Sequence, residues 1–223
     1  MPSFEYLLLA LPLLVISFTV HEFGHAWVAL KQGDDTAYLQ GRVTLNPAAH
    51  IDPFGSLLLP AIAMMTGAPL LGWARPVPVT TRKFRNYKRG DLLTSAAGVA
   101  GNFVLIVAFA FIGALAQVAQ AYGVEMGGAL DTVGRMCFLG GQMNAALIVF
   151  NLIPIPPLDG SRIIVHFLSA RAHQAYAEFA RYGMMILWGL VIFGALNFIW
   201  PAANLLNGAV VRVVNLPFML LLG

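Results

Sequence analysis

Residues 5–31 read EYLLLALPLLVISFTVHEFGHAWVALK, and this stretch decides what kind of chain the sequence encodes. Its first part, residues 6–20, contains no Asp, Glu, Lys or Arg. Because about 20 mostly apolar residues are enough for a helix to cross a bilayer, the stretch predicts a membrane-spanning helix. His21, Glu22 and His25 follow directly after the uncharged run. Ionisable residues inside a membrane helix are costly to insert and usually mark a functional site.

The composition of the whole chain agrees with this start. The 223 residues are 59% hydrophobic and 10% charged, with a mean hydropathy of +0.76. A soluble domain carries about 25% charged residues, so the composition excludes a disordered chain, a nucleic-acid-binding protein and an ordinary cytosolic enzyme. Further uncharged runs occupy 53–74, 92–124, 136–158 and 182–211. We predict an all-α polytopic membrane protein with about 4–6 transmembrane helices, forming a single domain over residues 1–223.

The distribution of charge predicts how the chain is oriented in the membrane. Lys and Arg gather in 75–89 and 162–181, whereas residues 123–132 carry acidic residues only. Since basic loops stay in the cytosol, we expect both basic loops there and the acidic turn outside. His166 and His173 lie in the second basic loop and are expected to be solvated.

The HEFGH motif has the spacing of a metal site. Residues i and i+4 share one face of a helix, so His21 and His25 can bind one metal ion with Glu22 beside it. Zinc suits a pair of neutral imidazoles, and it lowers the pKa of a bound water to about 7. Glu22 would take a proton from that water, the hydroxide would attack a peptide carbonyl, and Glu22 would pass the proton to the leaving amine. The alternative is a chance HExxH on a solvated helix face, which the apolar surroundings disfavour.

A catalytic zinc site needs a third protein ligand, and Asp159 is the candidate. It ends the sequence NLIPIPPLD at 151–159, in which prolines prevent a regular helix and free backbone groups. Broken backbone at membrane depth is tolerated where it is buried in protein or lines a wet cavity. The alternative is that Asp159 only begins the cytosolic loop that contains Arg162.

One shared metal requires the ends of two spans to lie on the same side of the membrane. If 53–74 crossed the bilayer, Asp159 would lie opposite His25. That segment is interrupted by proline and glycine, so we predict a re-entrant segment at 53–74 and an N-terminus outside the cell. Residues 37–45 alternate in polarity and predict a short β-hairpin at the membrane face, whose edge could bind an extended substrate.

At these residues the chain resembles the site-2 protease family, peptidase family M50, over most of its length. HEFGH at 21–25 and NLIPIPPLDGSRI at 151–163 resemble the two signatures of that family in the expected order. The stretch 41–60 is similar to its small bacterial branch. No segment resembles the PDZ or CBS domains of larger members, so we expect neither domain.

The resemblance implies a role for particular residues. By resemblance, His21, His25 and Asp159 are the ligands of one Zn²⁺ per chain and Glu22 is the catalytic base. Asn151 matches a polar position that holds the substrate or the oxyanion.

The sequence AGVAGN at 97–102 resembles a further motif of the family, with Val99 where proline is usual. That departure bears on a local helix kink. Asn102, which ends the motif, is a candidate for contact with substrate or oxyanion; the alternative is that Asn102 and Asn144 hydrogen-bond helices together.

The expected function is therefore intramembrane proteolysis by a zinc metalloendopeptidase. The expected partners are the lipid bilayer and single-span membrane proteins as substrates, with no nucleic acid, and the oligomeric state stays open. We expect a multi-pass protein of the cell inner (plasma) membrane with its active site toward the cytosol. A metal-ion transporter and an inactive scaffold are the rivals. A transporter has no need of a glutamate inside the histidine pair, and no ligand is missing to support a scaffold.

Overall fold

The structure, a computed structural model, describes residues 4–66 and 72–222, and within these ranges no residue forms a β-strand. The long helices are α1 (Phe4–Gln32), α4 (Tyr87–Ala121), α5 (Ala129–Asn151) and α9 (Ile199–Leu222). The short helices are α2 (Thr36–Leu39), α3 (Leu59–Thr66), α6 (Asp159–Ile164), α7 (Ala170–Ala180) and α8 (Gly183–Ile192). A π-helical segment, η2, covers Pro53–Leu58, and 3-10 turns cover Pro47–Ala49 (η1), Thr81–Lys83 (η3), Val165–Phe167 (η4) and Ala195–Phe198 (η5).

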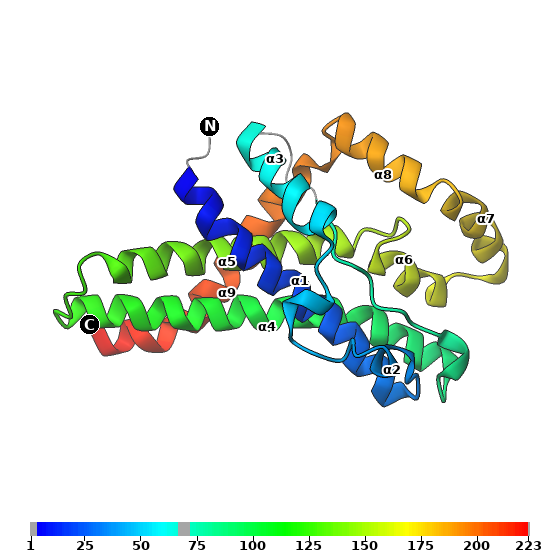
Figure 1. Ribbon diagram of the computed structural model, residues 1–223, viewed down its shortest axis with the longest axis horizontal. Coiled ribbons are helices and arrows are strands. Elements are labelled where there is room, and N and C mark those ends of the chain that lie inside the picture. Colours follow the sequence, from blue (N-terminus) through cyan, green and yellow to red (C-terminus); the bar gives the residue numbers. More distant parts are fainter. Residues whose placement is uncertain (1–3, 67–71, 223) are drawn as a thin grey trace.

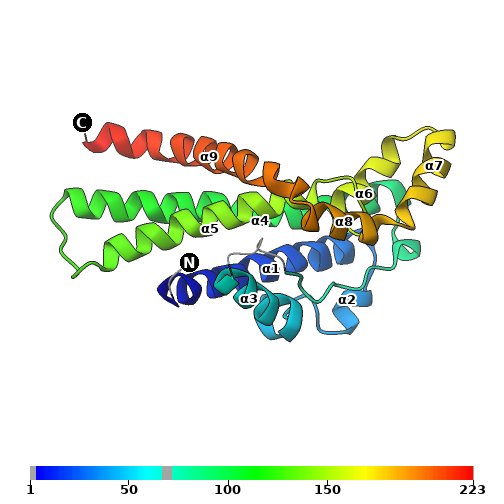
Figure 2. The same ribbon diagram turned by 90° about the horizontal axis from the view of Figure 1, so that it is seen from above.

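The helices α4 and α5 run side by side and form the centre of the molecule (Figure 1). In Figure 2, α1 lies on one side of this pair and α9 on the other. Leu14 and Phe18 of α1, one turn apart, pack with Met143 of α5 in a buried cluster. A second cluster joins α4, α5 and α9 through Ile106, Ala145, Ile148 and Ala203. The apolar faces of all four helices therefore meet in one bundle.

Three described helices are long and apolar enough to cross a membrane: Leu8–Gln32, Tyr87–Ala121 and Ala129–Asn151. A fourth span is possible if Gly183–Ile192 and Ala195–Met219, which are bent by 82°, count as one. The polytopic all-helical prediction is confirmed, but the predicted 4–6 spans are corrected to three, or up to four. One physical reason is that Gly194 adopts a left-handed φ of 68°, which interrupts the helix within the apolar run 182–211.

The predicted β-hairpin at 37–45 was wrong. Residues 36–39 form α2, and the backbone of the following turn bonds back onto it: Gly41 donates to the carbonyl of Tyr38 and Arg42 to that of Ala37. Asp34 also binds the backbone N–H of Thr36, 3.0 Å away. Because these local bonds satisfy the backbone, the stretch has no need of a strand partner.

The apolar segment 53–74 folds as η2 and α3, and residues 67–71 lie outside the described part of the chain. Asp52 begins it, with Oδ1 accepting the N–H groups of Phe54 and Gly55. Trp73 then donates its N–H to the carbonyl of Gly55 at 3.1 Å, and Ser56 Oγ donates to the carbonyl of Trp73 at 2.7 Å. The two ends of the segment are thus hydrogen-bonded to each other.

A proline turn returns the chain from α5 to the bundle. The turn occupies residues 152–158, between the end of α5 at Asn151 and the start of α6 at Asp159. A Cβ on Gly160 would lie 2.3 Å from the carbonyl oxygen of Leu152, so only glycine permits this close approach. The tight reversal places Asp159 as the first residue of α6.

Candidate metal centre

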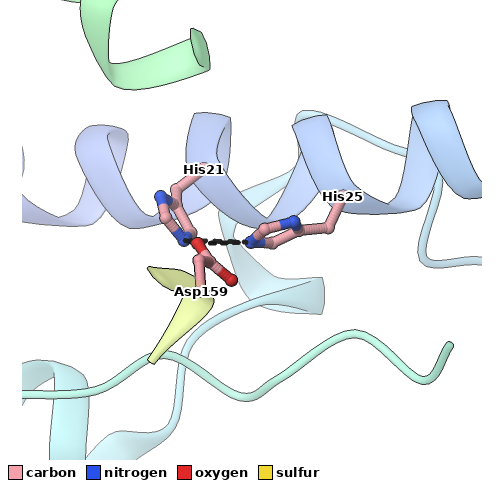
Figure 3. Close-up of side chains that lie close together, drawn as sticks. All are labelled: His21, His25 and Asp159. Atoms are coloured by element: carbon pink, nitrogen blue, oxygen red, sulfur yellow. Dashed lines mark hydrogen bonds and ion pairs between the residues drawn. The ribbon is translucent and has the colours of Figure 1, made fainter. Parts of the chain in front are cut away.

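Two side chains of α1, His21 and His25, converge with Asp159 at the start of α6 (Figure 3). His21 and His25 lie on successive turns of α1, with their Nε2 atoms 3.0 Å apart. Asp159 Oδ2 lies 3.3 Å from each of these nitrogens. All the candidate ligand atoms are within 4.8 Å of one another, and the side chains are almost fully buried.

The hydrogen bonds around the two imidazoles show that the group fits a metal ion. His21 Nδ1 is 2.6 Å from Asn102 Oδ1, and His25 Nδ1 is 2.7 Å from the carbonyl oxygen of Thr94. Both partners only accept, so both rings carry their proton on Nδ1 and a lone pair on Nε2. Asp159 Oδ2 is buried and has no hydrogen-bond donor among the described residues. Three lone-pair donors therefore face one another, and a bound cation would relieve their mutual repulsion.

The chemistry of the ligands points to zinc. Two neutral imidazoles and one carboxylate form a three-ligand set that leaves a coordination position open, as catalytic zinc sites do. His21, His25 and Asp159 are the residues that would hold the ion.

Glu22 follows the first ligand and is itself buried, with 9% of its surface exposed. Its Oε2 accepts the backbone N–H of Val77 at 2.8 Å. This bond holds one carboxylate oxygen and leaves Oε1 available for another partner. Glu22 also interacts electrostatically with His25, which places its negative charge near the ligand group.

Residues 73–80, which we call the strap, are the extended segment that carries Val77. Its backbone N–H groups bind inward: that of Arg75 donates to the carbonyl of His50 at 2.8 Å, and that of Thr80 to Oδ2 of buried Asp34 at 2.6 Å. Arg42, 6% exposed, donates to the carbonyls of Arg75 and Pro76 at 2.6 and 3.3 Å. Three anchors thus fix the strap, whose Val77 N–H binds Glu22.

Burial lowers the pKa of Arg42, Arg75 adds to that effect, and Glu22 opposes it. The guanidinium stays protonated, because its ordinary pKa is far above neutral. Arg42 therefore keeps a positive charge within electrostatic range of Glu22.

Helix α4 holds the two imidazoles through their Nδ1 atoms. Thr94 and Asn102 bind the Nδ1 atoms, and Gly98 lies between them, one turn from each. A Cβ on Gly98 would lie 2.5 Å from His25 Nε2 and 2.6 Å from His21 Nε2. Glycine at this position lets the backbone of α4 approach the two imidazoles.

The two asparagines singled out from the sequence lie in different surroundings. Asn102 is fully buried, and both ends of its amide are engaged, by His21 and by Asn144. Asn151 is the last residue of α5, and its Nδ2 donates to the carbonyl of Leu147 on its own helix at 3.0 Å. The structure records no hydrogen bond between Asn151 and the three ligands.

Sequence reasoning missed a charged cluster that ties α6 to α4. Asp91, 4% exposed, accepts from Arg162 through Oδ1 and is 2.8 Å from His166 Nε2 through Oδ2. The prediction that His166 is solvated was wrong, because only 7% of its side chain is exposed. An acid near the start of α4, beside an otherwise uncharged run, was the available signal.

An apolar helix bundle that brings an HExxH pair and a distant aspartate together has the architecture of a membrane-embedded metalloprotease. The family model for peptidase family M50 matches residues 9–194. The chain belongs to this family, which confirms the resemblance seen in the sequence.

Curated relatives agree with the family. One, from Bacillus subtilis (strain 168), is named "Putative zinc metalloprotease YwhC"; it is 38% identical over 212 residues, covering 94% of this chain and 92% of the relative. Rip2 of Mycolicibacterium smegmatis, also named as a zinc metalloprotease, is 31% identical over 82% of this chain and 66% of the relative. Rip2 of Mycobacterium tuberculosis (strain H37Rv) is 30% identical over the same shares. No solved structure matches the chain significantly.

Proposed function

We propose that this protein is a zinc metalloendopeptidase that hydrolyses peptide bonds in or near the transmembrane segments of single-span membrane proteins. His21, His25 and Asp159 bind one zinc ion per chain, and Glu22 is the catalytic base. The observation that carries this proposal is the convergence of three lone-pair donors beside a buried glutamate, within helices apolar enough to cross a membrane.

Zinc held by His21, His25 and Asp159 would supply a water whose pKa is lowered to about 7. Glu22 Oε1 would accept a proton from the attacking water, since Oε2 is held by the N–H of Val77, and the hydroxide would add to the peptide carbonyl. Glu22 then donates the proton to the leaving amine as the peptide bond breaks. The hydrogen bonds to Asn102 and Thr94 keep the imidazoles oriented throughout.

The substrate must lose its own helical hydrogen bonds before it can be cut, because a helix in lipid has its peptide groups paired and dry. The proline turn and the strap place irregular backbone close to the ligands, where a wet cavity is compatible with membrane depth. Asn151 is the candidate for substrate or oxyanion contact, because Asn102 is fully buried and both ends of its amide are engaged by His21 and Asn144.

The basic residues support an active site toward the cytosolic side of the inner (plasma) membrane. Thr94, which binds His25, lies less than two turns from Lys88 and Arg89 at the start of α4. The acidic residues Glu125 and Asp131 lie at or beyond the far end of that helix. Since cytosolic loops carry the excess of Lys and Arg, the ligand end of α4 faces the cytosol.

Glu22→Gln tests the function directly. Purified wild-type protein and the variant are compared for zinc content and for cleavage of a single-span test protein in the same vesicles. We expect equal zinc in both and a loss of cleavage of at least about 10²-fold in the variant, since a positioned base contributes about 10²–10⁴-fold. Cleavage that persists in Glu22→Gln, or a wild-type protein without zinc, would overturn the proposal.

A further inference from the structure

A chain of buried polar side chains leads away from His21 across three helices. Asn102 Oδ1 on α4 is 2.6 Å from His21 Nδ1, and Asn102 Nδ2 donates to Asn144 Oδ1 on α5 at 2.7 Å. Asn144 Nδ2 donates to Ser17 Oγ on α1 at 2.9 Å, and Ser17 Oγ donates to the carbonyl of Leu13 at 2.7 Å. Ser17, Asn102 and Asn144 are all fully buried.

Each bond in this chain fixes the direction of the next. The Ser17 hydroxyl donates to Leu13, so it accepts from Asn144, whose nitrogen also donates to the carbonyl of Gly140 at 2.8 Å. Asn144 must then turn its oxygen toward Asn102, and Asn102 must turn its oxygen toward His21. If the Asn102 amide were reversed, its oxygen would face the oxygen of Asn144.

The result at the metal end is a single state of the His21 ring. A carbonyl oxygen only accepts, so His21 carries its proton on Nδ1 and directs the lone pair of Nε2 toward Asp159 and His25. The other imidazole is fixed differently, because His25 donates to a backbone carbonyl, that of Thr94. Substitutions of Asn102 or Asn144 therefore act on His21 and leave the orientation of His25 unchanged.

We propose that Asn102 and Asn144 are positioning residues that hold His21 in the ring state and orientation required to bind the metal. Asn102 thus acts through His21 and does not contact substrate. This inference rests on the proposed function, because it assigns the residues a role at the same zinc site.

The test measures the zinc dissociation constant of purified protein by competition with a chelator, for Asn102→Leu, Asn144→Leu and Ser17→Ala. Loss of a hydrogen-bond partner behind a metal ligand typically weakens metal binding about 10–100-fold. We expect a loss in that range for Asn102→Leu and progressively smaller losses for Asn144→Leu and Ser17→Ala. If Asn102→Leu fails to fold, the order of the other two variants still tests the chain.

The matched control is Asn207→Leu, which alters another buried asparagine, 2% exposed, on α9. Its Oδ1 has no hydrogen-bond partner among the described residues, and we expect unchanged zinc affinity. Asn102→Asp keeps an acceptor facing His21, so it should bind zinc more tightly than Asn102→Leu.

Two other outcomes would overturn the inference. If Asn102 only joins helices, the variants lower the unfolding temperature of the metal-free protein and leave the zinc dissociation constant unchanged. If Asn102 contacts substrate, kcat/KM falls while zinc affinity stays at the wild-type value. Both outcomes leave the proposed function standing, since that fails only if the wild type lacks zinc or Glu22→Gln still cleaves.

Discussion

The helix α1 presents His21 and His25 from successive turns of a continuous helix, whereas α6 presents Asp159 from its first residue, directly after a proline turn. The α1 half of the metal centre is fixed by helix geometry and by hydrogen bonds to α4. The α6 half depends on a tight backbone contact with the end of α5 and on the hydrogen bonds of Asp91 with Arg162 and His166. We therefore expect Asp159 to be the most easily displaced of the three proposed ligands.

The largest effect is expected for Gly160→Ala. The added Cβ would lie 2.3 Å from the carbonyl oxygen of Leu152, and a backbone clash cannot be relieved by rotating a side chain. Overpacking of this kind costs about 1–3 kcal/mol, and here it displaces the residue next to a ligand. We predict that the free energy of zinc binding, measured by chelator competition, becomes weaker by at least about 1–3 kcal/mol. Gly134→Ala, which meets no atom within 4 Å, is the control.

Asp91→Asn should weaken the attachment of α6 to α4 and leave the contacts of α1 unchanged. The variant removes the charge that Arg162 and His166 share, and hydrogen bonds to charged groups contribute about 1.5–3 kcal/mol each. We predict weaker zinc binding and a lower unfolding temperature. Asp131→Asn, at an exposed acid bonded to Gln120, should change neither property. Equal zinc affinity in Asp91→Asn and the wild type would show that α6 is held by other contacts.

Arg42→Gln acts beside the α1 half, through the strap. It removes the guanidinium that binds the carbonyls of Arg75 and Pro76, so the N–H of Val77 holds Glu22 less firmly. We predict about a tenfold fall in kcat with zinc content unchanged, which is only part of the roughly 10²–10⁴-fold that a positioned base contributes. Arg82→Gln, at an exposed residue in η3, is the control. A fall in zinc content in place of kcat would contradict this role.

Gly98→Ala should have the smallest effect. Its Cβ would meet the far ends of the two imidazoles, and turning a side chain about 30° away from its rotamer costs about 0.5–1.5 kcal/mol. We predict a loss of zinc affinity smaller than that of Gly160→Ala, in the same chelator assay. A larger loss of zinc affinity in Gly98→Ala than in Gly160→Ala would show that Asp159 is not the more easily displaced ligand.

The sequence predicts the α1 half well, because the i, i+4 spacing of His21 and His25 has one geometric meaning in a helix. The chemical need for a third ligand indicates Asp159, although no local pattern shows which distant segment packs on α1. Alternation over 37–45 predicts a strand, but hydrogen bonds from Gly41 and Arg42 close a helical turn there. The hydrogen bond from Val77 to Glu22 has no side-chain signature, because it comes from the backbone.

X-ray absorption at the zinc edge identifies the atoms that bind the metal ion. In purified wild-type protein we predict one zinc per chain, bound by two imidazole nitrogens and by oxygen at about 2.0–2.2 Å. In Asp159→Cys the same measurement should find one sulfur at about 2.3 Å. Wild-type protein without stoichiometric zinc, or an Asp159→Cys spectrum identical to the wild type, would contradict the account.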